Sequence, residues 1–565
     1  MLNINKTVLK KYPQLKKLPK PVSKGVIKTI NKIVHKNEID EFLKEFPQKE
    51  PFTFIEEALE KLNFSYKYTV SEIENIPVNG RIIIIANHPT GILDTFCLID
   101  LVKKVRKDIK VMANNLLLLE QLKSILIGVD NFENKITKTS LSNINKSLQN
   151  EEAIIIFPSG EVSRPTPTGI RDGKWHKGFL HFAKHNKAPI LPVFIKAKNS
   201  KIFYSMSLIN KNLSSLLLFN EMFKKKNSHL EFKIGELIPF DSFDNKIDEQ
   251  YQVKLFKKHL YKIGKNKKEV YQTQKPIIHP VDKKELKDEL KRCEVLGKTT
   301  DGKIIYLYKY SPDSVILKEI ARLREYTFRK VGEGTGKRKD KDKYDYYYDH
   351  IILWNEDELE IVGSYRIGNG EFIYKKFKEK GFYTNTLYEF GDEFIKILPN
   401  AIELGRSFVV PKYWGSRALD LLWQGIGAYI KSKNNIRYLF GPVSLSTEIP
   451  LFAQEMIIYY FDKYYGKNKH LVKAKNPFIV SKNSLEEFNS VFKGGLKEDF
   501  NILRSYLNYY NTSIPTLYKQ YTDLCEREGA SFIDYNVDED FNNCIDSFVL
   551  VDISTIKPQK KKRYL

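Results

Sequence analysis

The stretch RIIIIANHPTGILD at residues 81–94 decides the fold of the first half of the chain. Four consecutive isoleucines favour a buried strand, because a continuous β-branched run suits a strand that is covered on both faces. The run ends at a polar turn that carries His88, and Asp94 follows six positions later. A carboxylate on one ring nitrogen fixes the tautomer of a histidine and raises its basicity. The stretch therefore predicts either a proton-accepting histidine at the end of a strand or a loop histidine that is hydrogen-bonded to a helix cap.

The amino-acid composition limits the classes of protein to which the chain can belong. The chain has 565 residues, too many for one core, and 42% of them are hydrophobic, which is typical of globular domains. The formal net charge of +24 implies an anionic partner, which could be nucleic acid, an anionic lipid surface or an acidic carrier protein. Four scattered cysteines favour a reducing compartment without disulfides. The sequence shows no signal-peptide core and no membrane-spanning run, so we expect a cytoplasmic protein, peripheral on the inner face of the cytoplasmic membrane.

The first half alternates short apolar strands with helical spans, which predicts an α/β domain with a largely parallel sheet. Strands are expected at 82–86, 110–113, 153–157, 190–195 and 230–234, with helices such as 94–104 and 140–149 between them. We expect a basic helical arm over 1–50, the α/β domain over 51–270 and a linker over 271–300. Leucines within 205–226, followed by three lysines, predict either a membrane-facing patch or ordinary core packing.

The second domain is expected over 301–565. Its predicted elements are strands at 304–308, 351–354, 360–367 and 401–410, and helices at 313–326 and 417–431. The glycine-dotted stretch 331–344 superficially resembles a phosphate-binding loop. It lacks the GxxxxGK[ST] spacing and runs into alternating Lys and Asp, so we expect a mobile surface loop near a ligand.

Further blocks follow the His88 turn in a fixed order. They are FPSGEVSR at 157–164, DGKWHKGF at 172–179 and PILPVF at 189–194. Together with the first stretch they resemble the glycerophospholipid (PlsC-like) acyltransferases over roughly residues 65–240. The resemblance implies acyl transfer from a thioester to a hydroxyl, with His88 as the base and Asp94 as the residue that holds its imidazole. The substrate-binding residues that it implies are Asn87, Gly160, Glu161 and Arg164, and turn amides around Gly160 would bind the acceptor or an oxyanion.

Two departures from that family pattern concern the acceptor. Five residues separate His88 from Asp94 where the family usually has four. The third block usually reads FPEGTR, whereas here Ser159 takes the place of the glutamate, Glu161 follows the glycine and Arg164 is displaced. The altered block argues against a glycerol-phosphate acceptor more than against acyl transfer. The form NHPxGxLD resembles the divergent branch often labelled haemolysin-like.

The second half contains another set of charged residues. The set consists of Arg324, Asp345, Asp349, Arg366, Glu403 and Arg406. On an extended strand Glu403 would share a face with Gly405, and Arg406 would lie on the opposite face. A strand carboxylate could accept a proton from an amine, and arginines could hold a carboxylate or a phosphate. Each residue alone could equally form a structural ion pair.

The order Arg…Asp…Asp…GxxR…ExxR resembles the acyl-homoserine-lactone synthases and the ornithine N-acyltransferases within the GNAT-like superfamily. Coverage runs from about 285 to 565. The resemblance implies that Glu403 serves as the base of an amide-forming step, with Arg324, Asp345, Asp349, Arg366 and Arg406 as substrate-binding residues. It also implies an acyl carrier protein as donor, because the pyrophosphate motif of coenzyme-A-using enzymes is only echoed at 412–418.

The two resemblances together imply a bifunctional enzyme of ornithine-lipid or glycine-lipid synthesis. The second half would join a 3-hydroxyacyl chain from acyl carrier protein, or from acyl-CoA, to the amine of an amino acid. The first half would then esterify the hydroxyl of that lyso-aminolipid, in contact with an anionic membrane surface. No metal and no cofactor is expected. Alternatives are a lysophospholipid acyltransferase whose second half only binds carrier protein, a membrane scaffold without activity, and a nucleic-acid-binding protein, for which no motif appears.

Overall fold

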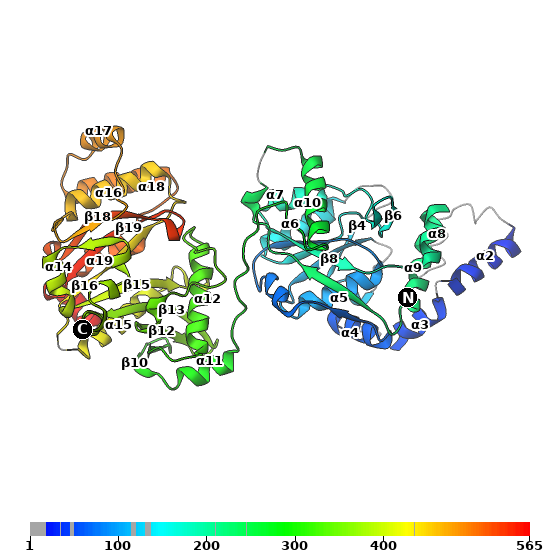
Figure 1. The fold of residues 1–565 in the computed structure, drawn as a ribbon, viewed down its shortest axis with the longest axis horizontal. Helices are drawn as coiled ribbons and strands as arrows, with labels where there is room; N and C mark the ends of the chain where they lie inside the picture. The colour runs from blue at the N-terminus through cyan, green and yellow to red at the C-terminus, as the bar shows by residue number, and fades with distance from the viewer. Residues whose placement is uncertain are drawn as a thin grey trace. The chain divides into compact units, whose positions relative to one another are not determined.

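The computed structural model describes residues 19–565 except 34, 46–49, 115–119, 130–136, 210, 244–245 and 434. The chain divides into two compact units, Met1–Pro276 and Ile277–Leu565. Figure 1 shows that each unit has its own sheet with helices packed on it. Among the described residues, no helix has both the length and the apolar character that crossing a bilayer requires.

The first unit is built on a seven-stranded sheet. Its order is β1-β9-β8-β2-β5-β3-β4, and every neighbouring pair is parallel except β8 and β9. The strands are β1 Ser65–Lys67, β2 Ile82–Ala86, β3 Ile109–Asn114, β4 Leu126–Val129, β5 Ala153–Ile156, β8 Ile190–Lys196 and β9 His229–Ile234. The largely parallel α/β sheet is thus confirmed, although β1 and β4 were not predicted because they are only three and four residues long.

Helices cover both faces of this sheet. They are α2 Lys20–Ile33, α3 Lys36–Glu45, α4 Pro51–Lys61, α5 Ile92–Lys103, α6 Lys138–Gln149, α7 Gly178–His185, α8 Lys201–Ile209, α9 Lys211–Lys224 and α10 Glu249–Ile263. Strand β2 explains the isoleucine run, because Ile82 and Ile84 enter one core and Ile83 and Ile85 enter the other. A strand buried on both faces needs apolar side chains at every position.

The expected arm and linker are both partly structured. Helices α2 and α3 lie within the expected arm, whose first 18 residues are outside the described part of the chain. The expected linker contains α11 (Lys283–Leu290) and β10 (Glu294–Lys298). Leu286 and Leu290 of α11 are buried in a core of the second unit, and Asp282 caps the helix by accepting two backbone N–H groups. The helix was missed because only two of its residues are buried.

The second unit has an eight-stranded sheet in the order β10-β11-β12-β13-β15-β16-β19-β18. Its further strands are β11 Ile304–Tyr308, β12 Asp349–Asn355, β13 Glu360–Asn369, β15 Ala401–Val409, β16 Tyr438–Leu445, β18 Ala530–Asp538 and β19 Cys544–Asp552. All neighbours are antiparallel except β15 and β16. Two short antiparallel strand pairs stand apart: the hairpin of β6 (Arg164–Thr166) and β7 (Gly169–Arg171) in the first unit, and the long-range pair of β14 (Tyr388–Phe390) and β17 (Val472–Ala474) in the second.

Helices of the second unit enclose its sheet. They are α12 Val315–Arg329, α13 Gly370–Phe377, α14 Asp392–Ile397, α15 Ala418–Lys431, α16 Leu451–Tyr465, α17 Lys482–Val491, α18 Leu496–Tyr509, α19 Thr516–Leu524 and α20 Pro558–Tyr564. Helix α15 buries Leu422, Trp423 and Ile426 against the sheet, as its helical spacing predicts. The α/β prediction is therefore confirmed in this unit as well.

The parallel pair β15 and β16 separates part-way along its length. The two strands pair only from Ala401 to Glu403, opposite Tyr438 to Phe440. Beyond that point β15 continues to pair with β13, and β16 continues to pair with β19. Gly441 lies at the point of separation, where an added Cβ would come within 2.0 Å of the Leu404 carbonyl oxygen. The sheet is consequently open between the C-terminal halves of these two strands.

Candidate active sites

The first candidate site lies where β2 ends and α5 begins. His88 Nδ1 is 3.2 Å from Asp94 Oδ2, although the contact lacks the alignment of a hydrogen bond. Asp94 is fully buried and accepts the backbone N–H groups of Thr90 at 2.7 Å and Gly91 at 3.0 Å, together with the Thr90 hydroxyl. The His88 ring packs on Phe157 with centroids 4.3 Å apart. Three donors thus hold the carboxylate beside the imidazole.

The same aspartate is also the helix cap, so the two interpretations of the sequence are not exclusive. Asp94 is the third residue of α5, and its carboxylate reaches back to the Gly91 N–H in a capping box. Gly91 has φ +92°, a left-handed conformation in which other residues are strained. The extra residue between His88 and Asp94 therefore fits a turn that contains a glycine.

A second carboxylate, Asp172, holds the His88 turn from the other side. Its Oδ1 accepts the His88 N–H at 3.1 Å and the Ser163 hydroxyl at 2.6 Å, and its Oδ2 accepts the Trp175 indole N–H at 2.9 Å. The Ser163 N–H donates in turn to the His88 carbonyl at 2.7 Å. Burial raises the pKa of Asp172. In the sequence Asp172 stands out only as part of the block at 172–179, since nothing local marks it as a partner of His88.

The predicted substrate-binding residues of this unit fall into two groups. Asn87 is buried, and its carboxamide both donates to the Ile195 carbonyl at 2.9 Å and accepts the Ile195 N–H at 2.7 Å. It ties β2 to β8, and its expected contact with substrate stays a prediction. Gly160 and Glu161 are exposed in the turn after β5, and Arg164 lies 3.6 Å from the Glu161 carboxylate. Gly160, with φ +61°, makes the turn possible.

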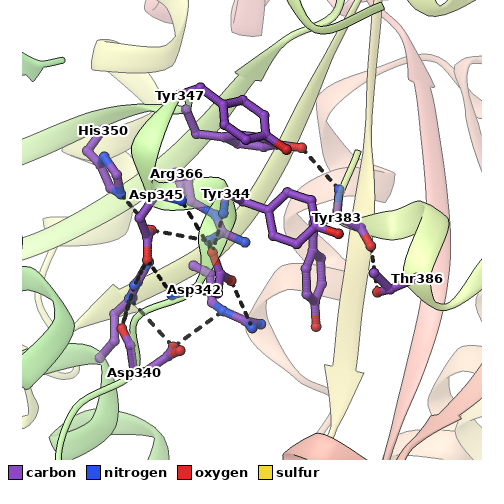
Figure 2. A network of polar contacts seen from close by, with 12 residues as sticks. Asp340, Asp342, Tyr344, Asp345, Tyr347, His350, Arg366, Tyr383 and Thr386 are labelled. Carbon is purple, nitrogen blue, oxygen red and sulfur yellow. Dashed lines mark hydrogen bonds and ion pairs between the residues drawn. The ribbon is translucent and has the colours of Figure 1, made fainter. Parts of the chain in front are cut away.

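The second candidate site is a buried network of arginines and aspartates (Figure 2). Arg324 donates two hydrogen bonds to Asp345, at 2.9 and 2.7 Å, and both side chains are fully buried. Arg366 donates to Asp342 at 2.7 Å and to Asp345 at 3.1 Å, and His350 Nε2 lies 3.3 Å from Asp345. Burial alone would raise the pKa of Asp345, but the two arginines outweigh it and hold the pKa well below its usual range. Arg324 and Asp345 thus form a buried ion pair, and their expected role in substrate binding stays a prediction.

Arg406 joins this network because of a bulge in β15. Arg366 pairs with Gly405 and Ser364 with Phe408, so two residues of β15 oppose one of β13, and Arg406 has φ +48°. The bulge turns the Arg406 side chain to the face that holds Arg366, so the predicted strict alternation is wrong at this residue. Its guanidinium lies 3.3 Å from Asp340 and 4.5 Å from the centre of the Tyr383 ring.

The loop before β12 supplies most of the carboxylates. Asp340 is 3% exposed and Asp342 is partly exposed, and each has one carboxylate oxygen without a hydrogen bond. The stretch 331–344 was predicted to be a mobile surface loop, because alternating Lys and Asp are normally solvated. The structure corrects this for Asp340 and for Tyr344, whose side chains are buried.

Glu403, the predicted base of the amide step, is buried and fully hydrogen-bonded. It is 1% exposed and accepts four hydrogen bonds, from the N–H and hydroxyl of Thr384, the Tyr383 N–H and the Tyr348 hydroxyl. Burial raises the pKa of Glu403, and these donors counteract that rise. The carboxylate anchors residues 383–384 to β15, and the predicted role of Glu403 as a base stays a prediction.

Asp349 lies outside this site. It is the first residue of β12, and its carboxylate accepts a hydrogen bond from the Tyr429 hydroxyl of α15 at 3.1 Å. Its neighbour His350 points to the opposite face, toward Asp345, because side chains alternate along a strand. The expected role of Asp349 in substrate binding stays a prediction.

A group of acidic residues that the sequence did not reveal lies at the open end of the sheet. Glu333 accepts a hydrogen bond from the Ser444 hydroxyl of β16 at 2.9 Å, and Ser444 pairs with Asp546 of β19. Burial raises the pKa of Glu333 to about 7 and the pKa of Asp546 well above its usual range. Asp538, whose pKa is also raised by burial, accepts a hydrogen bond from the Tyr383 hydroxyl at 3.2 Å. These residues are spread over more than 200 positions, so no local motif marks them.

Comparisons with known proteins match both units of the chain. The acyltransferase family model matches residues 8–270, and the acetyltransferase (GNAT) domain model matches residues 323–424. A glycine N(alpha)-acyltransferase of Bacteroides thetaiotaomicron is 34% identical over 309 residues, which are 51% of this chain and 89% of that protein. A lyso-glycine lipid O-acyltransferase of the same organism is 31% identical over 252 residues, 43% of this chain and 90% of that protein. The chain belongs to the glycine N-acyltransferase and lyso-glycine lipid O-acyltransferase families.

Membership in both acyltransferase families confirms the prediction of a bifunctional enzyme of aminolipid synthesis that carries out N- and O-acylation. An L-ornithine N(alpha)-acyltransferase of Brucella abortus is also similar, with 30% identity over 175 residues, 26% of this chain and 60% of that protein. In this aminolipid acyltransferase, no group of three or more side chains suited to hold a metal ion occurs within the described residues.

Proposed function

We propose that the enzyme makes a diacylated glycine lipid in two steps. The second unit transfers a 3-hydroxyacyl group from a thioester to the glycine amine, which forms a C–N bond, breaks the C–S bond and releases the thiol. The first unit transfers another acyl group to the hydroxyl of that product. Support for glycine comes from the extent of similarity, since 89% of the glycine N-acyltransferase is covered but only 60% of the ornithine N-acyltransferase. Ornithine is the second candidate.

We propose that His88 performs the ester step as a general base. Its Nε2 takes the proton of the acceptor hydroxyl while the oxygen attacks the thioester carbonyl, and the proton then passes to the departing thiolate. Asp94 stabilises the imidazolium that forms at this stage, because its carboxylate is fixed 3.2 Å from Nδ1. The single observation that carries the function is this pair, present in a chain whose first half matches O-acyltransferases.

For the amide step, we propose Glu333 as the proton acceptor in place of Glu403. The donor Ser444 occupies one of its carboxylate oxygens, and the residue lies beside the part of β16 that has separated from β15. A carboxyl whose pKa is about 7 can accept a proton from an amine near neutral pH. Asp342 and Arg406, at the more exposed edge of the arginine–aspartate network, are proposed to bind the amino acid.

We also propose acyl carrier protein as the donor and a peripheral contact with an anionic membrane. The net charge of +24 favours both, because each partner is acidic. Ile202 and Leu208 of α8 are 63% and 74% exposed, which suits insertion between lipid headgroups. The side chains of Leu213, Leu216 and Phe219, which belong to the expected leucine patch, lie outside those the structure describes.

One experiment tests the assignment of the ester step. The full chain is expressed in a bacterial host that makes no aminolipids, and new lipids are identified by mass spectrometry. We expect His88→Ala to accumulate the mono-acylated amino acid and to lack the diacylated lipid. His185→Ala, which removes an exposed histidine of the same unit, serves as the matched control and should give the wild-type pattern. Lysophosphatidate acylation without any aminolipid would contradict the proposal.

The amide step is tested by its pH profile. Because Glu333 must be deprotonated to accept a proton, the wild-type rate of N-acylation should rise with pH through about 7 and then level off. Glu333→Gln should lower the rate by about two to four orders of magnitude and remove that rise. Glu448→Gln removes a neighbouring negative charge that helps to raise the pKa of Glu333, so this variant should keep the rise but shift it to lower pH. An unchanged profile in Glu333→Gln would exclude Glu333 as the base.

A further inference from the structure

A groove lined almost entirely by positive charge lies on the first unit. Its volume is about 350 Å³, and its walls come from the end of β7, the helix α10 and the residues that follow α10. The lining residues are Arg171, Lys254, Lys257, Lys258, Tyr261, Lys262, Lys265 and Lys267. Seven of these eight side chains are cationic and none is acidic, so the groove concentrates positive potential.

The charge of this groove opposes the stability of the helix that carries it. Lys254, Lys258 and Lys262 follow one another at four-residue intervals, which places like charges side by side on one face of α10. Among the described residues, no ion pair joins any of these three lysines to a carboxylate. Lysines near the end of a helix can stabilise its dipole, but Lys254 and Lys258 lie in the middle of α10. An anionic partner would offset the repulsion.

The groove is joined directly to the catalytic turn. Lys257 Nζ donates to the carbonyl oxygens of Asp172 and Gly173, at 2.7 and 2.5 Å, and the Tyr261 hydroxyl accepts the Asp172 N–H at 2.8 Å. The side chain of the same Asp172 holds the His88 N–H. Residues of the groove wall therefore bond to the segment that positions the base of the ester step.

We propose that this groove is the docking surface for an acidic acyl carrier protein that delivers the acyl group to His88. The acidic carrier is complementary in charge to the groove. The groove borders the segment at Asp172 that positions His88, and the carrier must present its thioester beside His88. A concave surface lined by flexible lysine stems suits acidic side chains of a protein better than the plane of a bilayer. The proposal rests on the O-acylation proposed above and adds the partner surface for that step.

Charge reversal on the full-length enzyme tests the proposal. The variant Lys258→Glu/Lys262→Glu/Lys265→Glu is compared with Lys67→Glu/Lys107→Glu/Lys146→Glu, which changes three exposed lysines of the same unit outside the groove. Ester formation is measured on purified mono-acylated substrate with acyl carrier protein as donor, at 50 and 300 mM NaCl. We expect the KM for the carrier to rise about tenfold or more in the groove variant at low salt, with kcat within about twofold and a weaker salt dependence.

The remaining outcomes separate this proposal from the proposed function. If wild type forms no ester, the O-acyltransferase assignment fails. If wild type is active and the groove variant keeps the wild-type KM and salt dependence, only the docking surface is overturned. Loss of binding to phosphatidylglycerol vesicles with an unchanged carrier KM would assign the groove to lipid and overturn it as well. A Lys→Gln version of the same triple, together with thermal denaturation of both variants, distinguishes misfolding from lost docking.

Discussion

The variant Glu403→Gln distinguishes two possible roles of Glu403 in the N-acyltransferase unit, a base in catalysis and an anchor for residues 383–384. One oxygen of Glu403 accepts the Thr384 N–H at 2.7 Å and the Thr384 hydroxyl, and the other accepts the Tyr383 N–H at 3.1 Å and the Tyr348 hydroxyl. Glutamine keeps one oxygen and presents an NH₂ group to the other two donors. Because the Tyr348 hydroxyl can rotate and accept, about one bond is recovered.

The loss of stability in Glu403→Gln can be worked out from these hydrogen bonds. A hydrogen bond to a charged group contributes about 1.5–3 kcal/mol, so Glu403→Gln should lower the free energy of unfolding by about 2–4 kcal/mol. In a unit of this size, each kcal/mol shifts the melting temperature by about 2 °C, which gives a decrease of about 4–8 °C. The rate of N-acylation at 15 °C, where the variant stays folded, should remain within about tenfold of wild type.

The assay pairs thermal denaturation followed by intrinsic fluorescence with initial rates of N-acylation. Thr384→Val, which removes a single hydroxyl donor to Glu403, is the control and should cost about 1 kcal/mol with little change in rate. If Glu403 were the base, Glu403→Gln would lose two to four orders of magnitude in rate at 15 °C, whatever its melting temperature. That result would refute the positioning role.

Two further predictions concern Asp172 and the buried partner of Asp345, Arg324. Asp172→Asn should lower the rate of ester formation about 10- to 100-fold and leave amide formation unchanged, because an amide NH₂ would face the donors from His88 and Ser163. The ratio of the two products is measured by mass spectrometry. Equal loss of both products would contradict the prediction. Arg324→Lys should destabilise the second unit by about 3–5 kcal/mol, because lysine cannot form the two buried bonds to Asp345. The Arg324→Lys variant should then form no amide product at 37 °C, whereas its ester formation on supplied lyso-lipid should persist. Full amide activity at 37 °C would show that the Arg324–Asp345 pair is dispensable.

Several features could be predicted from the residues because their causes are local. The isoleucine run specified β2, since only a strand buried on both faces needs an apolar side chain at every position. The spacing of His88 and Asp94 specified their contact, because a strand, a turn and the first turn of a helix leave little freedom over six residues. Family blocks then identified both acyltransferase halves.

Other features could not be predicted because their causes are long-range. A bulge that depends on pairing with β13 decides the face of Arg406, and strand alternation alone gives the wrong answer. Glu403 looked like a base in the sequence, but residues 383–384 and Tyr348 close over it in the fold. Asp172 acts on His88 from 84 positions away.

The sequence by itself determined that this protein has two α/β acyltransferase units and placed His88 and Asp94 together at the end of a strand. Only the tertiary structure decided which buried carboxylates are held by donors and which retain a raised pKa near the opening of the sheet. The physical reason is that hydrophobic periodicity and short turns act between neighbours in the chain. The burial and hydrogen bonding of a charged group depend instead on residues that the fold brings together from hundreds of positions apart.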